Sequence, residues 1–250
     1  MNHPTNDSGD AAARYRSAVL STAAADLGTD VGPGTTVVAS VRRRGSTLAV
    51  AYPLGDRTIV WCSPELAPRL APIGQLGAVS YEQFVEAASA LGGSFDGAGH
   101  HRVLTNGSLG RRIEGYRFTT LDRDDAHDRA LIGAFVAGCS EDDLDEAELA
   151  MDELDPAIAV LIDGGGSIAS YASARPWSID AGFDDIAVIT HPDRRGRGLG
   201  AAVVGEFARR RRRQGRVLFY NCDVENIGSN HVAVAAGFQL VCTVVAVGFD

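Results

Sequence analysis

A short run of arginine and glycine, RRGRGLG at Arg194–Gly200, lies between two apolar segments of different period. The segment before it, Phe183–Thr190, has the length and composition of a buried strand. The segment after it places apolar side chains at helical spacing, at Leu199, Val203, Val204 and Phe207. The run therefore predicts a turn from a strand into a helix over residues 199–214, which ends before Gly215 because glycine commonly follows a helix.

A turn of this kind is suited to an anion. The first N–H groups of a helix have no partner within the helix, and its dipole is positive at that end. Two well-known phosphate loops are excluded, since GxGxxG has a different final spacing and GxxxxGK[ST] needs a lysine, which this sequence lacks. A glycine-rich connection that binds nothing is the alternative at this point.

Composition limits the classes of function. The 23 basic residues are all arginine and the net charge is −9, which argues against a general nucleic-acid-binding surface and excludes lysine Schiff-base chemistry. The four cysteines have no zinc-binding spacing, so we expect no metal. No apolar stretch is long enough for a membrane span and the first residues do not resemble a signal peptide. We expect a cytoplasmic protein with neither a membrane nor a nucleic acid as partner.

The first part of the chain predicts a small α/β region of unknown role. A helix is expected over Ala11–Leu27 and another over Ser80–Leu91. Between them, a small antiparallel meander is expected from three short strands, Thr36–Val41, Thr47–Tyr52 and Arg57–Cys62. The glycine-rich stretch Gly92–His101, with more glycine over residues 106–110, predicts a linker. We therefore place a domain boundary near residue 112, which gives regions 1–111 and 112–250.

The second region alternates strands and helices, as an α/β fold requires. A hairpin is expected from Ala157–Asp163 and Ser167–Arg175 around three glycines, and a second, acidic helix over Glu141–Leu154. The remaining expected elements are the strands Tyr116–Leu121, Arg216–Asp223 and Phe238–Phe249 and the helices Asp122–Gly138 and Ser229–Ala236.

Three motifs in register within residues 112–250 resemble the GNAT superfamily of acyl-CoA-dependent N-acetyltransferases. They are Val188–Thr190 followed by His191-Pro192, Arg195-x-x-Gly198-x-Gly200, and Asn226-x-x-Ser229 followed by Gly237-Phe238. The resemblance implies a central mixed, mostly antiparallel sheet flanked by helices. It also implies that Phe183–Thr190 and Arg216–Asp223 splay apart around the acyl donor, acetyl-CoA. Residues 1–111 would be a smaller α/β domain, and a degenerate copy of the same fold is one interpretation of it.

The same resemblance implies the residues that contact acetyl-CoA. Backbone groups of Val188, Ile189 and Thr190 would bind the pantetheine arm, and one of their N–H groups would stabilise the oxyanion. The turn would bind the pyrophosphate through Arg195, Gly196, Arg197, Gly198, Leu199 and Gly200. Asn226 and Ser229 would add contacts, although both are also ordinary helix-capping residues.

Catalytic side chains are less well marked. Asp184 occupies the position at which some GNAT proteins carry a carboxylate that acts as the catalytic base. Asp184 and Asp185 could instead be solvated residues at the start of a strand. Many members of the superfamily have a tyrosine that acts as the general acid at the position where this chain has Ala233. His231 and Cys222 lie nearby, but we interpret them as a surface and a core residue.

These motifs predict an N-acetyltransferase that moves an acetyl group from acetyl-CoA to a primary amine of a small molecule or protein. The alternative is a non-catalytic acyl-CoA-binding regulatory module, which the missing tyrosine favours. The acceptor is not identified: the acidic helix could attract a cationic amine, or it could simply be solvated. We interpret the arginines of Arg209–Arg213 as a solvated helix end, and a homodimer is compatible with the sequence.

Overall fold

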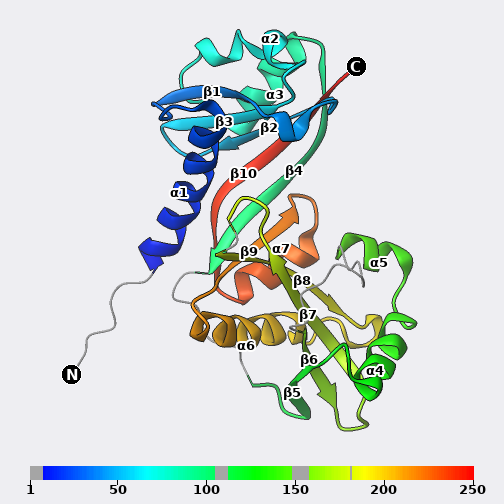
Figure 1. Cartoon of the computed structure of the whole chain (residues 1–250). Helices are drawn as coiled ribbons and strands as arrows, with labels where there is room; N and C mark the ends of the chain where they lie inside the picture. The colour runs from blue at the N-terminus through cyan, green and yellow to red at the C-terminus, as the bar shows by residue number, and fades with distance from the viewer. Residues whose placement is uncertain (1–7, 105–111, 148–157, 181) are drawn as a thin grey trace, which may run out of the picture. The chain divides into compact units, whose positions relative to one another are not determined.

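A computed structural model describes residues 8–104, 112–147, 158–180 and 182–250 (Figure 1). Their contacts divide the chain into two compact units. The turn unit is built mainly from Val103–Tyr220 and Gly228–Gln239, and the amino-terminal unit from Gly9–Arg102, Asn221–Ile227 and Leu240–Asp250. The last strands of the chain thus contribute to both units. The proposed functional division at residue 112 stays a prediction.

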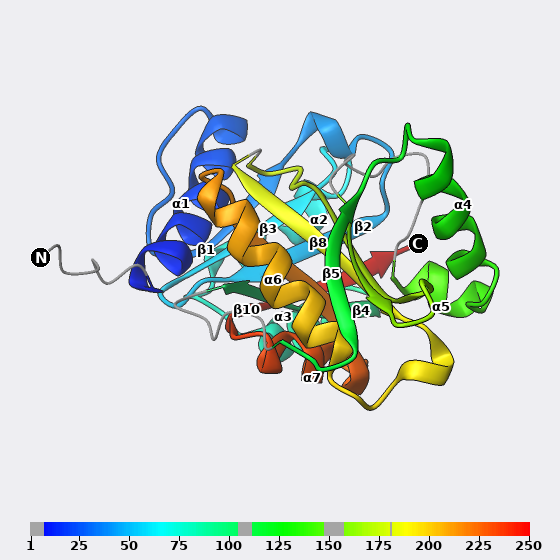
Figure 2. The same ribbon diagram turned by 90° about the horizontal axis from the view of Figure 1, so that it is seen from below.

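The turn unit contains a mixed sheet whose strands run in the order β9-β8-β7-β6-β5. Every neighbouring pair among β5 to β8 is antiparallel, and β8 and β9 are parallel. The strands are β5 Tyr116–Leu121, β6 Ile158–Asp163, β7 Ile168–Pro176, β8 Phe183–Thr190 and β9 Val217–Asp223. The helices are α4 Ala126–Val136, α5 Glu141–Glu146, α6 Leu199–Arg213 and α7 Ile227–Ala235 (Figures 1 and 2).

Helices cover both faces of this sheet, which explains why the first five residues of β6 are all buried. Ile158, Val160 and Ile162 share one hydrophobic cluster with Ile132 and Phe135 of α4. The alternate residues of β6 point to the other face, where α6 contacts β6, β7 and β8. The apolar face predicted for α6 is buried there, with Val203 and Val204 both fully covered. The helix ends before Gly215, which has a φ of 78°, so this prediction is confirmed.

In the amino-terminal unit, neighbouring strands follow the order β1-β3-β2-β10-β4. Its strands are β1 Gly34–Ala39, β2 Leu48–Pro53, β3 Arg57–Cys62, β4 Gly93–Leu104 and β10 Phe238–Phe249, and its helices are α1 Ser8–Leu27, α2 Ala67–Leu70 and α3 Tyr81–Ala90. The predicted antiparallel meander is wrong in one pairing, because β1 pairs with β3 and is parallel to it. A tight turn with Gly55 at a φ of 90° joins β2 to β3, whereas residues 40–47 are long enough to carry the chain past one strand.

The predicted linker Gly92–His101 is also wrong, because these residues form most of β4. Its glycines mark close packing in the sheet. A Cβ atom on Gly93 would lie 2.6 Å from Cγ1 of Val247, and one on Gly99 would lie 2.6 Å from Oδ1 of Asn221. Glycine within a strand permits such an approach of neighbouring chains.

Some predictions fall partly outside the described residues. The second acidic helix is observed as α5, Glu141–Glu146, and residues 148–154 of the expected helix are not described. The glycines expected at residues 106–110 also lie outside the described ranges. Of the helices that the structure describes, none combines the length and the apolar character that a membrane span requires.

Candidate functional site

The turn that joins β8 to α6 has the expected backbone geometry. Gly196 and Gly198 both have a φ of 74°, a left-handed conformation that side chains other than glycine adopt rarely. Gly198 is the N-cap of α6, and no side chain caps this end of the helix. The first N–H groups of α6 therefore keep their capacity to bind an anion.

Gly200 is required for a different reason. A Cβ atom at this position would lie 3.1 Å from Cγ2 of Val232 on α7 and 3.3 Å from Oγ1 of Thr190 at the end of β8. The first turn of α6 therefore packs closely against both neighbours. This packing accounts for Gly200 without any ligand, whereas Gly196 and Gly198 are accounted for by the conformation of the turn.

Strands β8 and β9 pair over only part of their length. The parallel ladder joins Phe183–Asp185 to Val217–Phe219 and ends there, although β8 continues to Thr190. On its other side, β8 pairs with β7 up to Thr190. The second half of β8 thus has a backbone edge that β9 does not cover within the described residues. This divergence is the splay that the motifs predicted.

The register shows which peptide groups face this edge. The N–H of His191 donates to the carbonyl of Ala169, so odd-numbered residues of this part of β8 turn their peptide groups toward β7. The carbonyl of Ile189 accordingly accepts a hydrogen bond from Ser170 Oγ at 3.3 Å. Val188 and Thr190 turn theirs toward the open edge. The geometry thus supports Val188 and Thr190 as backbone ligands and argues against Ile189.

The arginines of the turn contact other parts of the turn unit. Nη2 of Arg195 donates to Oδ1 of Asp143 on α5 at 2.6 Å, and its Nε donates to the carbonyl of Thr190 at 3.2 Å. Half of the Arg195 side chain remains exposed. The pKa of Asp143 is lowered by the hydroxyl of Ser140 and by Arg195. Arg195 is thus held near the end of β8 with half of its side chain accessible.

Asp184 lies in a buried cluster of ion pairs. Its side chain is fully buried, and its two oxygens accept hydrogen bonds from Arg211 Nε at 2.6 Å and from Arg216 Nε at 2.9 Å. Both oxygens are therefore engaged by guanidinium groups, which argues against Asp184 as a base toward a substrate. It is not a solvated residue either. Sequence reasoning missed this ion pair because its partners lie 27 and 32 positions away.

The same contacts explain part of the arginine run at the end of α6. Arg211 faces inward to Asp184, and Arg209 pairs with Glu206 one turn earlier. The guanidinium of Arg210 lies 4.3 Å from the centre of the Phe118 ring. The expectation of a solvated helix end therefore holds only in part, since these three arginines make intramolecular contacts.

The position at which many GNAT proteins have a tyrosine is buried here, together with its neighbour Tyr220. Ala233 on α7 is fully buried. The hydroxyls of Tyr220 and Ser229 lie 2.9 Å apart, and Tyr220 is 1% exposed. Tyr220 directly follows Phe219, the last residue of β9 in the ladder with β8.

Asn226 belongs to the amino-terminal unit, where its N–H donates to the carbonyl of Asp223. Its role toward a cofactor stays a prediction.

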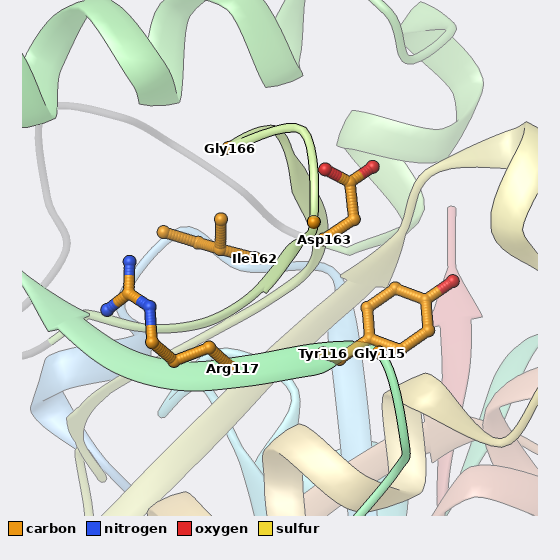
Figure 3. Close-up of a pocket in the computed structure, with 7 residues that line it drawn as sticks. Gly115, Tyr116, Arg117, Ile162, Asp163 and Gly166 are labelled. Carbon is orange, nitrogen blue, oxygen red and sulfur yellow. The ribbon is translucent and has the colours of Figure 1, made fainter.

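A pocket of about 480 Å³ lies at the start of β5, and sequence reasoning missed it. It is lined by Gly115, Tyr116, Arg117, Ile162, Asp163, Gly164 and Gly166 (Figure 3). Arginines of the turn contact two of these residues: Arg194 Nη2 lies 3.0 Å from Asp163 Oδ2, and Arg197 Nη1 lies 3.4 Å from the Tyr116 hydroxyl. The pocket therefore adjoins the turn. Its only signal in the sequence is the run of three glycines after Asp163.

No group of three or more histidine, cysteine, aspartate or glutamate side chains within the described ranges could hold a metal ion. All four cysteines are free thiols. The donor set of the turn is made of backbone N–H groups and guanidinium groups. Such groups bind anions.

The comparisons with known proteins concern the fold. No protein-family model and no curated protein matches the sequence. Among solved structures, an acetyltransferase of the GNAT family from Colwellia psychrerythraea matches with a TM-score of 0.51 and 16% identity, over 76% of each chain. The chain has the GNAT fold. This agrees with the splayed strands and the turn, and it confirms the predicted fold class.

Two further matches are less similar. A GCN5-related N-acetyltransferase from Kribbella flavida has a TM-score of 0.49 at 16% identity, over 77% of this chain and 68% of the other. A putative acetyltransferase from Salmonella typhimurium, whose structure contains acetyl-CoA, has a TM-score of 0.37 at 18% identity, over 55% of this chain and 95% of the other.

Proposed function

We propose that the protein is an acyl-CoA-dependent N-acetyltransferase that moves an acetyl group from acetyl-CoA to a primary amine. The observation that supports this most is the end of the β8–β9 ladder at Asp185 and Phe219, followed by an uncapped helix start after Gly198. A backbone edge able to bind an extended arm is thus continuous with a turn able to bind a pyrophosphate.

In the proposed reaction, the neutral amine attacks the thioester carbonyl and forms a tetrahedral oxyanion. The N–H of Val188 faces the open edge and is the proposed oxyanion donor, as a preorganised backbone group can be. Collapse of the intermediate breaks the carbon–sulfur bond and releases the thiolate, and the amine loses its proton to solvent. A thiolate can leave without a general acid because thiols have a pKa near 8.5.

The turn would contribute backbone N–H groups at Leu199 and Gly200 and the half-exposed Arg195 side chain. Arg195 is suited to this role because it presents several N–H groups in a fixed plane, and two of its nitrogens are already held by Thr190 and Asp143. It would thus bind phosphate oxygens with little further loss of side-chain freedom.

Two observations favour the alternative, a non-catalytic acyl-CoA-binding module. Ala233 provides no acid and is buried, and Asp184 is engaged in ion pairs. The two proposals differ in turnover. Incubation with acetyl-CoA and a panel of polyamines, amino sugars, amino acids and peptide amino termini, with free thiol as the readout, separates them. Thiol release that depends on the amine supports the enzyme; acetyl-CoA binding without release on any amine supports the module.

A further inference from the structure

Two buried hydroxyl groups on β7 have no hydrogen-bond partner within the described residues. They belong to Tyr171 and Ser173, whose side chains are both fully buried. Burial raises the pKa of Tyr171 to about 12, so its phenol stays neutral. The Ser173 hydroxyl is close enough to lower this pKa slightly, but the pair lacks the geometry of a hydrogen bond. Buried hydroxyls without a partner destabilise a fold, so a pair of them points to a ligand.

The strand register places these hydroxyls beside the part of β8 that β9 does not cover. Ser173 lies directly opposite Ala187, and Tyr171 lies opposite Ile189. Both positions of β8 come after Asp185, where the ladder with β9 ends. Residues directly opposite each other in a sheet point to the same face, with about 5 Å between their Cβ atoms. A ligand that lies over Ala187 would therefore be adjacent to the Ser173 hydroxyl.

The face that carries the two hydroxyls is the more accessible face of β8. Tyr171 belongs to the hydrophobic cluster that α4 forms with the sheet, which identifies this face as the α4 face. On the opposite face, which α6 covers, Asp184 and Ile186 are buried. On the α4 face, Asp185 and Ala187 remain partly exposed. An amine can thus approach the open edge of β8 from the α4 face.

The charges around the hydroxyls disfavour a polycation. Arg175 and Asp185 compensate each other across 3.4 Å on the same face. Burial dominates the raised pKa of Tyr171, but the charge of Arg123 is near enough to lower it, so a cation already lies close to the phenol. Neutral hydroxyl groups both donate and accept hydrogen bonds, and the hydroxyl groups of a ligand match them. The arrangement therefore fits an amine that carries hydroxyl groups, such as an amino sugar, better than a polyamine.

We propose that Tyr171 and Ser173 bind the acceptor, and that the acceptor is a hydroxylated amine whose hydroxyl groups pair with theirs while its amino group lies over Ala187. The proposal rests on the proposed function and identifies the class of acceptor, which the turn and the open edge of β8 leave unspecified.

Removal of each hydroxyl separates a ligand-binding group from a structural one. Tyr171→Phe and Ser173→Ala each delete one oxygen and break no hydrogen bond of the folded protein, so the Tm should stay unchanged or rise. Tyr15→Phe is the matched control, because the Tyr15 hydroxyl lies 2.6 Å from Nδ1 of His101 and its loss should lower the Tm. A fall in either acceptor-site variant as large as that in Tyr15→Phe would show that the hydroxyl is bonded within the protein and would overturn the proposal.

Acetyl transfer to matched amines tests the ligand. The pairs are D-glucosamine with cyclohexylamine and serinol with isopropylamine, so that the members of a pair differ in their hydroxyl groups. At saturating acetyl-CoA, Tyr171→Phe and Ser173→Ala should each raise KM for the hydroxylated member about tenfold and leave the other member within about twofold, because only the former loses a hydrogen bond. Each variant is compared with the unmodified protein on the same amine, which cancels the different pKa values of the amines. Tyr15→Phe should change neither KM.

The outcomes are distinct. Equal changes for both members of each pair, or no change for either, overturn the assignment of Tyr171 and Ser173 and leave the proposed function standing. Transfer to polyamines, peptide amino termini or the members without hydroxyl groups, but to no hydroxylated amine, overturns the acceptor class and also leaves the proposed function standing. Binding of acetyl-CoA without transfer to any amine overturns the proposed function and this inference together.

Discussion

At the scale of single residues, the same arginine-rich chain uses its guanidinium groups in two ways. Arg211 and Arg216 are largely covered and neutralise Asp184, whose carboxylate is fully buried. Arg195 is half exposed beside the turn. Their roles differ because a buried ion pair is costly to break, whereas an exposed guanidinium can exchange its partner for a ligand.

Replacing Asp184 by asparagine distinguishes a structural residue from a base. The substitution leaves Arg211 and Arg216 without their shared anion, so we expect the free energy of unfolding to fall by about 3–5 kcal/mol. Chemical denaturation measures this fall. Asp185→Asn is the matched control: its carboxylate pairs with Arg175 across a partly exposed contact of 3.4 Å. Its loss should cost less than about 1 kcal/mol. Unchanged stability with loss of acetyl transfer in Asp184→Asn would instead identify a base.

At the scale of elements, a buried polar cluster fastens α1 to the sheet of the amino-terminal unit. The hydroxyl of Tyr15 on α1 lies 2.6 Å from Nδ1 of His101 on β4 and 3.6 Å from Sγ of Cys242 on β10. Tyr52 on β2 packs edge-to-face on the His101 ring. Burial lowers the pKa of His101 from 6.5 to about 3, so the ring is neutral in the folded protein.

This cluster predicts a pH dependence of stability. Unfolded His101 takes up a proton below about pH 6.5, whereas the folded protein does not until about pH 3, so protons favour the unfolded state between these values. The contribution of His101 is complete above pH 6.5 and falls by roughly 1.4 kcal/mol per pH unit below it. Denaturation at pH 7.5, 6 and 5 should show this fall. In His101→Gln the free energy of unfolding should depend less steeply on pH, whereas His231→Gln should leave this dependence unchanged. An unchanged slope in His101→Gln would contradict the account.

The elements also show what the sequence could predict. The strand β8 and the helix α6 were placed within a residue of their ends, because a period change and a glycine mark each boundary. The β1–β3 pairing was missed because the partner of a strand depends on strands that are distant in the sequence. The strand β4 was missed because its glycines resemble those of a linker, and only the structure shows that they pack against Val247 and Asn221. The pocket was missed because Tyr116 and Asp163 meet only through strand pairing.

At the scale of the whole molecule, the fold is observed in the structure, whereas the activity is a proposal. The GNAT fold is established by the structural match and by the strand divergence in the turn unit. Acetyl-CoA as donor is a proposal that follows from the turn and the open edge of β8. The role of the amino-terminal unit, including the interpretation as a degenerate copy of the same fold, stays a prediction. Fold alone does not determine activity.

The most direct test of the central claim is a calorimetric titration of the full-length protein with acetyl-CoA. The account predicts one site per chain with a dissociation constant in the micromolar range, and competition by CoA. A sample that is folded by circular dichroism but shows no heat of binding at about 1 mM acetyl-CoA, where a site worth only about 4 kcal/mol would be half filled, would contradict it.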